Sequence, residues 1–425
     1  MATKIDVSDY PLIDAHCHPF KESTKILTRD EFSFIGDYIC GFNNPAFLTP
    51  SPILENYAKA AGAEKEELDR KYRISSIDAD LRLHVENLAL QKRMMRELSK
   101  FLGCAATPKD IVEARNRRSA DYREYIQRIF DDAKIQGLNV DDGYSELAVL
   151  FAIPSIDIDG LKTYVPAKVW RTTRVEPLFQ RSLDKSSTLD EMESDLLSSL
   201  EYSVKKLGAV SFKCVIAYRS GLNILKTEPE DAKKDFGKYK RKRSKTTGLT
   251  QGERMLTDLR NYMIWRAVEK SMELDVPFLF HTGVGDQDIV LKECNPTRLW
   301  DMLIDEDLRH AKIVLVHVGY PYISEAAFLT AVLPNVYLDL SILIPLAQVN
   351  PSRIAQVLEM APLTKVMYAS DVHLPDMYWL SAKIGKSMLG QALSQIVDSG
   401  VLTEDEAYKA AELILTGNAK RFFKI

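Results

Sequence analysis

The 425-residue sequence has few histidines, few cysteines and no long hydrophobic run. Its five cysteines are odd in number, lie far apart and contain no CxxC pair, which argues against a disulfide framework and against a cysteine zinc site. The apolar runs stay well under the roughly 18 residues of a membrane span, and residues 1–10 lack a signal-peptide core. A net charge of −4 indicates no polyanionic partner. These absences predict a cytoplasmic protein that binds neither membranes nor nucleic acids.

Short β-rich segments, each followed by helix-length sequence, recur along the chain. The first is PLIDAHCH at residues 11–18, and seven more begin near residues 138, 173, 208, 276, 311, 335 and 364. Apolar strands that alternate with helices form parallel sheets covered on both faces, and eight such units predict an α/β fold, a closed (β/α)₈ TIM barrel. A doubly wound open sheet fits the same alternation. The placement of the polar residues must therefore separate the two folds.

The stretch after the first expected strand has a different pattern. Residues 28–137 contain no strand-like run but carry apolar residues at helical spacing, as in ENYAKAAGAEKEELDRKY and SADYREYIQRIFDDAKIQG. We expect a single barrel domain over residues 1–425, with a helical insertion at residues 28–137.

His16 and His18 are two of only seven histidines, and they lie at the end of the first expected strand. Residues i and i+2 of a strand point to the same side, so both imidazoles face one direction while Cys17 faces the other. In a barrel, that direction is the interior at the mouth where the strands end. Neutral imidazoles bind divalent metals such as Zn²⁺. The pair therefore predicts a metal site at the barrel mouth.

Three more residues with metal-binding chemistry lie at the ends of later strands. His281 ends the fifth, His317 the sixth and Asp371 the eighth expected strand. A single histidine at a strand end is more often a hydrogen-bonded core residue, and we expect that role for His84 and His310. Five matching positions at strand ends favour a shared ligand shell, because all strands of a barrel end at one face.

The order of these residues resembles the amidohydrolase superfamily of metal-dependent hydrolases. More narrowly, DAHCHPF, FKCVIAYRSGL, FLFHTGVGDQD, HVGYPY and YASD are similar to the amidohydrolase-2 branch, which includes the nodulin/FluG-like amidohydrolase domain. The resemblance extends over essentially the whole chain. That domain occurs in fungi and plants fused to a glutamine-synthetase-like module, which we do not expect here. The resemblance implies a divalent metal cofactor, zinc in the first place, a small-molecule substrate and a homo-oligomeric state.

The resemblance leaves open whether one or two metal ions bind. In relatives with two metals, a lysine at the end of the fourth strand is carboxylated by CO₂ and bridges the ions, and Lys213 occupies that strand. In relatives with one metal, the HxH pair, the strand-five histidine and the strand-eight aspartate hold it. On that interpretation Lys213 is a cation that binds substrate, and His317 acts in catalysis.

A metal ion at this mouth would lower the pKa of a bound water from about 15.7 towards 7 and produce hydroxide at neutral pH. The resemblance implies that Asp371 takes the proton of that water and delivers it to the leaving group. His317 is then either a ligand of a second metal or a group that polarises the substrate carbonyl.

The substrate side is indicated by other polar residues near strand ends. Tyr218 and Arg219, past the fourth strand, offer a phenol and a guanidinium suited to a carboxylate. The remaining candidates are Arg174, Glu176, Asp286 and Asp288. Each of these residues could instead have a structural role, as a helix cap or as part of a surface ion pair.

The resemblance implies hydrolysis of a carbon–nitrogen amide bond in a small carboxylate-bearing substrate, such as a γ-glutamyl amide. Two alternatives stay open. One is metal-dependent, non-oxidative decarboxylation of an aromatic or unsaturated acid, and the other is a metal-holding scaffold without catalysis. Strand-end spacing predicts metal chemistry but does not identify the bond that reacts.

Overall fold

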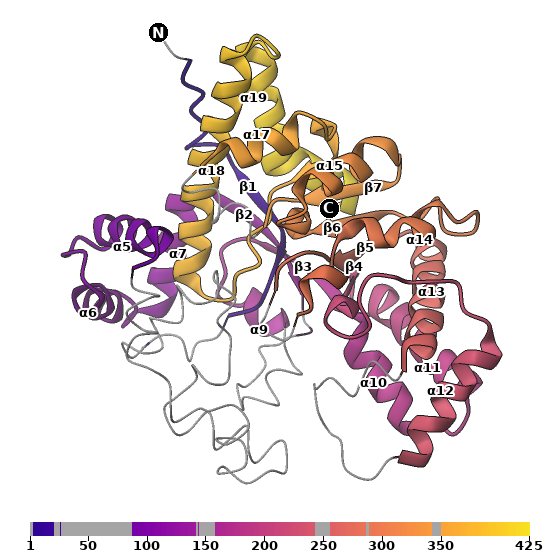
Figure 1. Ribbon diagram of the computed structural model, residues 1–425. Helices are drawn as coiled ribbons and strands as arrows, with labels where there is room; N and C mark the ends of the chain where they lie inside the picture. Colours follow the sequence, from indigo (N-terminus) through magenta and orange to yellow (C-terminus); the bar gives the residue numbers. More distant parts are fainter. Residues whose placement is uncertain are drawn as a thin grey trace.

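The computed structural model describes residues 3–20, 26, 87–141, 143, 158–242, 256–285, 289–341 and 350–425. Eight parallel strands follow one another around a barrel in sequence order (Figure 1). They are β1 (Leu12–Cys17), β2 (Ile135–Asp141), β3 (Lys168–Arg174), β4 (Ala209–Cys214), β5 (Phe278–His281), β6 (Ile313–Val316), β7 (Val336–Asp339) and β8 (Val366–Met367). Each strand pairs in parallel with the next.

Backbone hydrogen bonds join the last strand to the first. The Ala15 N–H donates to the Tyr368 carbonyl at 3.1 Å, and the Asp371 N–H donates to the His16 carbonyl at 2.9 Å. A doubly wound sheet would leave β1 and β8 without such contacts. The predicted (β/α)₈ barrel is confirmed, and the open-sheet alternative is wrong.

Helices surround this barrel (Figure 1). Those of the described residues are α5 (Ala89–Leu102), α6 (Pro108–Arg118), α7 (Tyr122–Ala133), α9 (Ile158–Lys162), α10 (Val175–Lys185), α11 (Leu189–Lys205), α12 (Pro229–Lys242), α13 (Thr257–Glu273), α14 (Trp300–Ile304), α15 (Ile323–Val332), α17 (Ser352–Leu358), α18 (Pro375–Asp398), α19 (Glu404–Glu412) and α20 (Asn418–Phe423). Among them, no helix is both long and apolar enough to cross a membrane.

The described part of the expected insertion contains α5, α6 and α7, while residues 28–86 lie outside the described residues. A buried ion pair ties these helices to the barrel: Arg115 Nε of α6 lies 2.9 Å from Asp376 Oδ2 at the start of α18, and both side chains are fully buried. Tyr125 of α7 donates its hydroxyl to the same carboxylate. Removing one partner would leave a buried charge uncompensated, so this contact holds α6 and α7 against the barrel.

The third strand lies earlier than its expected position. The segment that begins at Thr173 was expected to be a strand, but β3 ends at Arg174 and Val175 begins α10. Two physical reasons account for the difference. Lys168, at the start of β3, is exposed, so no continuous apolar run marks the strand, and Pro177 fits the first turn of a helix.

The amino ends of the strands are closed by α20. Phe422 and Phe423 of this helix join an apolar cluster with the inward side chains of the barrel strands, among them Ile13 and Leu279. The Phe422 ring packs against Tyr337 of β7, with centroids 4.0 Å apart. This end of the barrel is therefore a packed core, and the opposite end is left for chemistry.

Replacing Phe422 with alanine should lower the free energy of unfolding by about 3–5 kcal/mol, because it removes a large buried side chain and leaves a cavity. Phe422 is 5% exposed. Urea unfolding followed by circular dichroism measures the change.

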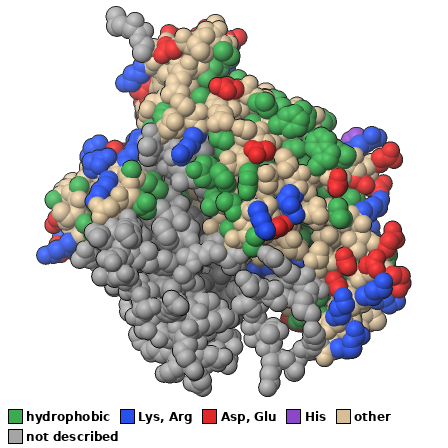
Figure 2. All heavy atoms as spheres, in the orientation of Figure 1, with side chains coloured by type: hydrophobic (Ala, Val, Ile, Leu, Met, Phe, Trp, Pro, Cys, Tyr) green, Lys and Arg blue, Asp and Glu red, His purple; other side chains and the backbone are tan. Residues whose placement is uncertain are grey.

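Phe328→Ala provides a matched control for that experiment, because Phe328 of α15 is 46% exposed. Other hydrophobic side chains also reach the surface on the face shown in Figure 2. The control should change stability by no more than about 0.5 kcal/mol. Equal losses for the two variants would contradict the role of α20 in the barrel core.

Candidate metal centre

Three ligand atoms converge where β1 and β8 end. Nε2 of His16 and Nε2 of His18 each lie 3.1 Å from Asp371 Oδ1. The three residues are buried, and their ligand atoms all lie within 4.8 Å of one another. Within the described residues, no other group of three His, Cys, Asp or Glu side chains meets this spacing. Two imidazoles and a carboxylate are a donor set typical of zinc and related divalent metals.

Asp14 positions this group from within β1. Its Oδ1 accepts hydrogen bonds from the backbone N–H of Ser370 at 2.9 Å and of His16 at 3.3 Å, and its Oδ2 accepts one from the Ser370 hydroxyl at 2.5 Å. Asp371, which directly follows Ser370, has a left-handed backbone with φ of 60°. Such a conformation in a non-glycine residue costs on the order of 1–3 kcal/mol and persists where surrounding contacts fix it. Asp14 therefore links β1, which carries His16 and His18, to the segment after β8, which carries Asp371.

Burial sets the protonation states that a metal needs. Burial, with a contribution from Lys213, lowers the pKa of His16 to about 4, and burial also lowers the pKa values of His281 and His317 well below their usual range. For Asp371, burial acts to raise the pKa, but His317 and the hydrogen bonds from the HxH pair outweigh it and lower the pKa well below the usual value. Neutral imidazoles and an ionised carboxylate are the forms that bind metal.

His281 and His317 lie beside the three converging ligands. His317 Nε2 lies 3.0 Å from His281 Nδ1 and 3.7 Å from Asp371 Oδ2. His281 Nε2 is buried and has no hydrogen-bond partner among the described residues. A buried imidazole nitrogen in that state calls for a ligand. These residues therefore fit a metal ion, with His281 as a further donor next to the converging group.

The space in front of His281 depends on Gly285. A Cβ atom at this position would lie 2.8 Å from His281 Nε2 and would also clash with the Tyr218 hydroxyl. The Tyr218 ring itself packs near His281, with centroids 4.6 Å apart. Glycine therefore avoids a clash with this buried nitrogen and with the Tyr218 hydroxyl.

We expect Gly285→Ala to weaken metal binding or turnover at least tenfold while changing the melting temperature little, because the added methyl group meets the site and not the core. Titration calorimetry with Zn²⁺ and a thermal melt measure the two effects. Gly237→Ala is the control, because a Cβ there meets only the flexible end of Arg241 in α12. Equal metal binding and equal turnover in the two variants would contradict the assignment of His281 as a metal ligand.

Lys213 is buried at the end of β4, with its Nζ 2.8 Å from His16 Nε2. Burial lowers the pKa of its ammonium group. The amine therefore lies against the converging ligands, in reach of the same bound group.

The candidate substrate residues lie in different surroundings. Arg174 at the end of β3 pairs with Asp141 of β2, at 2.6 Å between Nη2 and Oδ2. Arg219 follows a short 3₁₀ helix, η5 (Ile216–Tyr218), just past β4. Glu176 lies in the first turn of α10, not at a strand end, and its Oε1 accepts a hydrogen bond from the Val215 N–H at 2.6 Å. The predicted Asp286 and Asp288 are outside the described residues.

Several residues that support the site were missed by the sequence analysis. They are Asp14, Asp339, Ser341 and Ser370. A signal existed for two of them, because DLS at the end of the seventh strand places polar groups at the same face as the histidines. His310 is exposed in a turn, so its expected core role is wrong, and His84 is outside the described residues.

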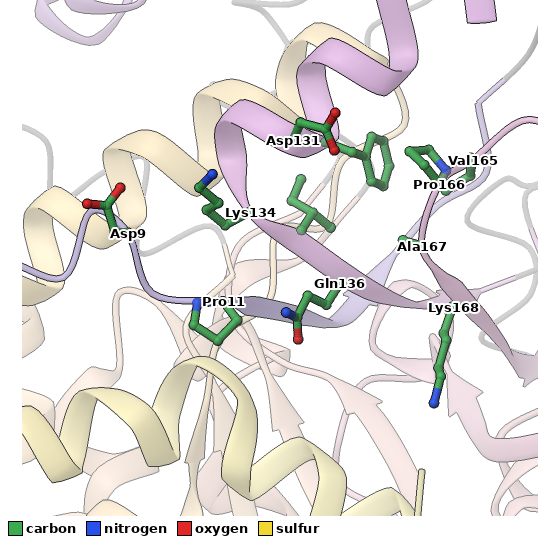
Figure 3. Close-up of a pocket in the computed structure, with 11 residues that line it drawn as sticks. Asp9, Pro11, Asp131, Lys134, Gln136, Val165, Pro166, Ala167 and Lys168 are labelled. Atoms are coloured by element: carbon green, nitrogen blue, oxygen red, sulfur yellow. The ribbon is translucent and has the colours of Figure 1, made fainter.

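An open groove lies at the amino ends of β1, β2 and β3, where Asp9, Lys134, Gln136 and Lys168 line it (Figure 3). It is at the opposite end of the barrel from the histidines. In (β/α)₈ enzymes the active site lies at the carboxyl ends of the strands. The groove is therefore not part of the candidate site.

The fold and the converging ligands define a (β/α)₈ barrel protein with a candidate metal site at the carboxyl ends of its strands. Residues 242–425 match the Amidohydro_2 family model, described as amidohydrolase. Over 259 residues, 59% of this chain, the sequence is 31% identical to Protein fluG of Emericella nidulans. The match spans 30% of that relative's length.

Solved structures show the same fold. A Lactobacillus casei protein assigned as a metal-dependent hydrolase aligns with a TM-score of 0.75 and 22% identity, covering 99% of this chain and 98% of that one. The uronate isomerase of Thermotoga maritima aligns with a TM-score of 0.63 and 15% identity, covering 98% and 95%. The solved structures share the fold, and the sequence matches show that this chain is similar to the amidohydrolase family over residues 242–425.

Proposed function

We propose that this protein is a metal-dependent hydrolase that cleaves a carbon–nitrogen amide bond in a small carboxylate-bearing substrate. The observation that carries the proposal is the convergence of His16 Nε2, His18 Nε2 and Asp371 Oδ1 beside the unpartnered His281 Nε2. The amidohydrolase match over residues 242–425 supports the amide class. A γ-glutamyl amide is the specific candidate. Cytoplasmic location and a homo-oligomeric state remain predictions.

The residues that would hold the cation are His16, His18, Asp371 and His281, with zinc as the leading candidate. The chemistry that such a cation supplies is a water of lowered pKa, which provides the nucleophile at neutral pH. If two ions bind, Lys213 and His317 are the additional ligands. A lysine with a lowered pKa has a larger fraction of neutral amine, the form that adds CO₂ to give a carbamate.

The two carboxylate oxygens of Asp371 face different partners, which suits two roles. Oδ1 faces the Nε2 atoms of the HxH pair, whereas Oδ2 lies 3.7 Å from His317 Nε2. One oxygen could bind the cation while the other accepts a proton and passes it to the leaving group. With one metal, His317 is not needed as a ligand and is available to act in catalysis beside Asp371.

Arg219→Ala should raise the KM for a carboxylate-bearing substrate much more than it changes metal content. Loss of a charge-assisted contact costs on the order of 1.5–3 kcal/mol, or about 10- to 150-fold in KM. Steady-state kinetics and elemental analysis measure the two quantities. Arg181→Ala, which changes a 52% exposed guanidinium on α10, is the control. Equal kinetics for wild type and Arg219→Ala would remove Arg219 from the substrate site.

The reaction itself is tested on a panel of N-acyl amino acids, γ-glutamyl amides and aromatic or unsaturated acids. Metal-loaded protein is assayed for released amine and released CO₂, with His16→Ala as the inactive control. Amine release that requires His16 supports the proposal. Release of CO₂ without amine would replace it with decarboxylation, and stoichiometric metal without turnover would favour the non-catalytic scaffold.

A further inference from the structure

Two buried polar residues, Asp339 and Ser341, lie at the end of β7 and just past it, beside His317. Asp339 Oδ1 accepts hydrogen bonds from the backbone N–H of His317 and of Ser341, each at 3.0 Å. The Ser341 hydroxyl also lies 2.5 Å from this oxygen. Since a backbone N–H can only donate, Oδ1 acts as an acceptor. The hydroxyl proton of Ser341 therefore points at Asp339.

With its single proton used in this way, Ser341 Oγ has only lone pairs left. It lies 2.8 Å from His317 Nδ1, so the proton of that contact belongs to Nδ1. A neutral imidazole carries one N–H, so His317 Nε2 keeps a lone pair. A proton on His317 Nε2 instead would require Ser341 to donate to Nδ1 and to give up its short bond to Asp339.

The same assignment of protons extends to the imidazole ring of His281. His317 Nε2 lies 3.0 Å from His281 Nδ1, so the lone pair of the first nitrogen requires a proton on the second. The neutral His281 ring then has its lone pair on Nε2. This is the buried nitrogen that has no hydrogen-bond partner among the described residues.

We infer that Ser341 and Asp339 are positioning residues that hold His317 and His281 in their Nδ1–H tautomers and so leave the His281 Nε2 lone pair available to a ligand. The functional meaning rests on the proposed metal centre, because metals bind the unprotonated imidazole nitrogen. Supporting hydrogen bonds of this kind set ligand orientation and raise affinity in metalloproteins. Asp339 also receives the backbone N–H of His317, whose φ is 67°, and thereby fixes its left-handed backbone.

The tautomers are read by ¹⁵N NMR of histidine-labelled, metal-free protein, with His281→Gln and His317→Gln used to assign the signals. Wild type should show protonated Nδ1 and unprotonated Nε2 in both rings. Ser341→Ala should shift both rings towards mixed tautomers and raise the Kd for Zn²⁺ about 10- to 100-fold. Ser341→Thr keeps the hydroxyl and should restore both readings to within about threefold of wild type.

The control is Ser271→Ala, which removes a buried hydroxyl that donates to the Val268 carbonyl within α13, and it should behave as wild type. The NMR measurement is made without metal, so it separates this inference from the proposed function. An Nε2–H proton on wild-type His281, or unchanged tautomers in Ser341→Ala, would overturn the inference even if zinc binds. Should Ser341→Ala not fold, the wild-type tautomers alone decide. The expected tautomers without zinc binding in any variant would support the inference and overturn the metal-dependent function.

Discussion

The His16→Ala/His18→Ala double variant should purify as a folded protein that carries no metal. Two of the three converging ligand atoms are lost, and a single carboxylate cannot replace them. The barrel should remain folded, because its apolar core is formed by other residues and the site lies at the carboxyl ends of the strands. Elemental analysis of the protein, with far-UV circular dichroism, measures both effects.

A matched control for the double variant is His310→Ala. His310 is exposed, so its loss should change neither metal content nor fold. If the double variant held metal at the wild-type stoichiometry, the metal site would have to lie elsewhere in the chain.

Asp371→Asn should lower turnover by at least the roughly 10²- to 10⁴-fold that general acid–base catalysis contributes. The substitution keeps the shape of the side chain but removes its ability to accept a proton. The ionised state of Asp371 is strongly favoured in the wild type, because His317 and the HxH pair lower its pKa despite its burial. Stopped or continuous assays of amine release give kcat, and metal content is measured on the same samples.

The Asp371→Asn result must be compared at equal metal occupancy. Excess Zn²⁺ in the assay compensates for weaker binding if the amide oxygen is a poorer ligand. A fully loaded variant with the wild-type kcat would exclude Asp371 as the proton acceptor. Asp235→Asn, which changes a buried carboxylate between α12 and α13, is a control for general effects of removing a buried charge.

The centre of the site could be predicted from sequence because it follows from strand periodicity. His16 and His18 are two residues apart in a strand, and Asp371 ends the last β-rich segment, so the barrel alone brings them together. The supporting residues could not be predicted in this way. Asp14 accepts hydrogen bonds from Ser370, 356 residues away, and that pairing depends on the closed seam.

The fold shows a similar division. Apolar strands such as β5 and β6 are visible as short runs of buried residues. Lys168 at the start of β3 interrupts such a run, so the third strand was placed too late. Periodicity predicts which side chains are buried and that Asp339 and Ser341 lie at the strand ends, but it does not predict their hydrogen bonds to His317 on the neighbouring strand.

The seam between β1 and β8 has a consequence for biosynthesis. His18 and Asp371 are 353 residues apart, and they meet only when the last strand pairs with the first. A nascent chain on the ribosome therefore cannot assemble the metal site before nearly all of its strands have been translated. Contacts of such long sequence separation form slowly, because the loop entropy must be lost first. A cation that binds only the closed barrel would stabilise it after release, by an amount that grows with the ratio of free metal to Kd.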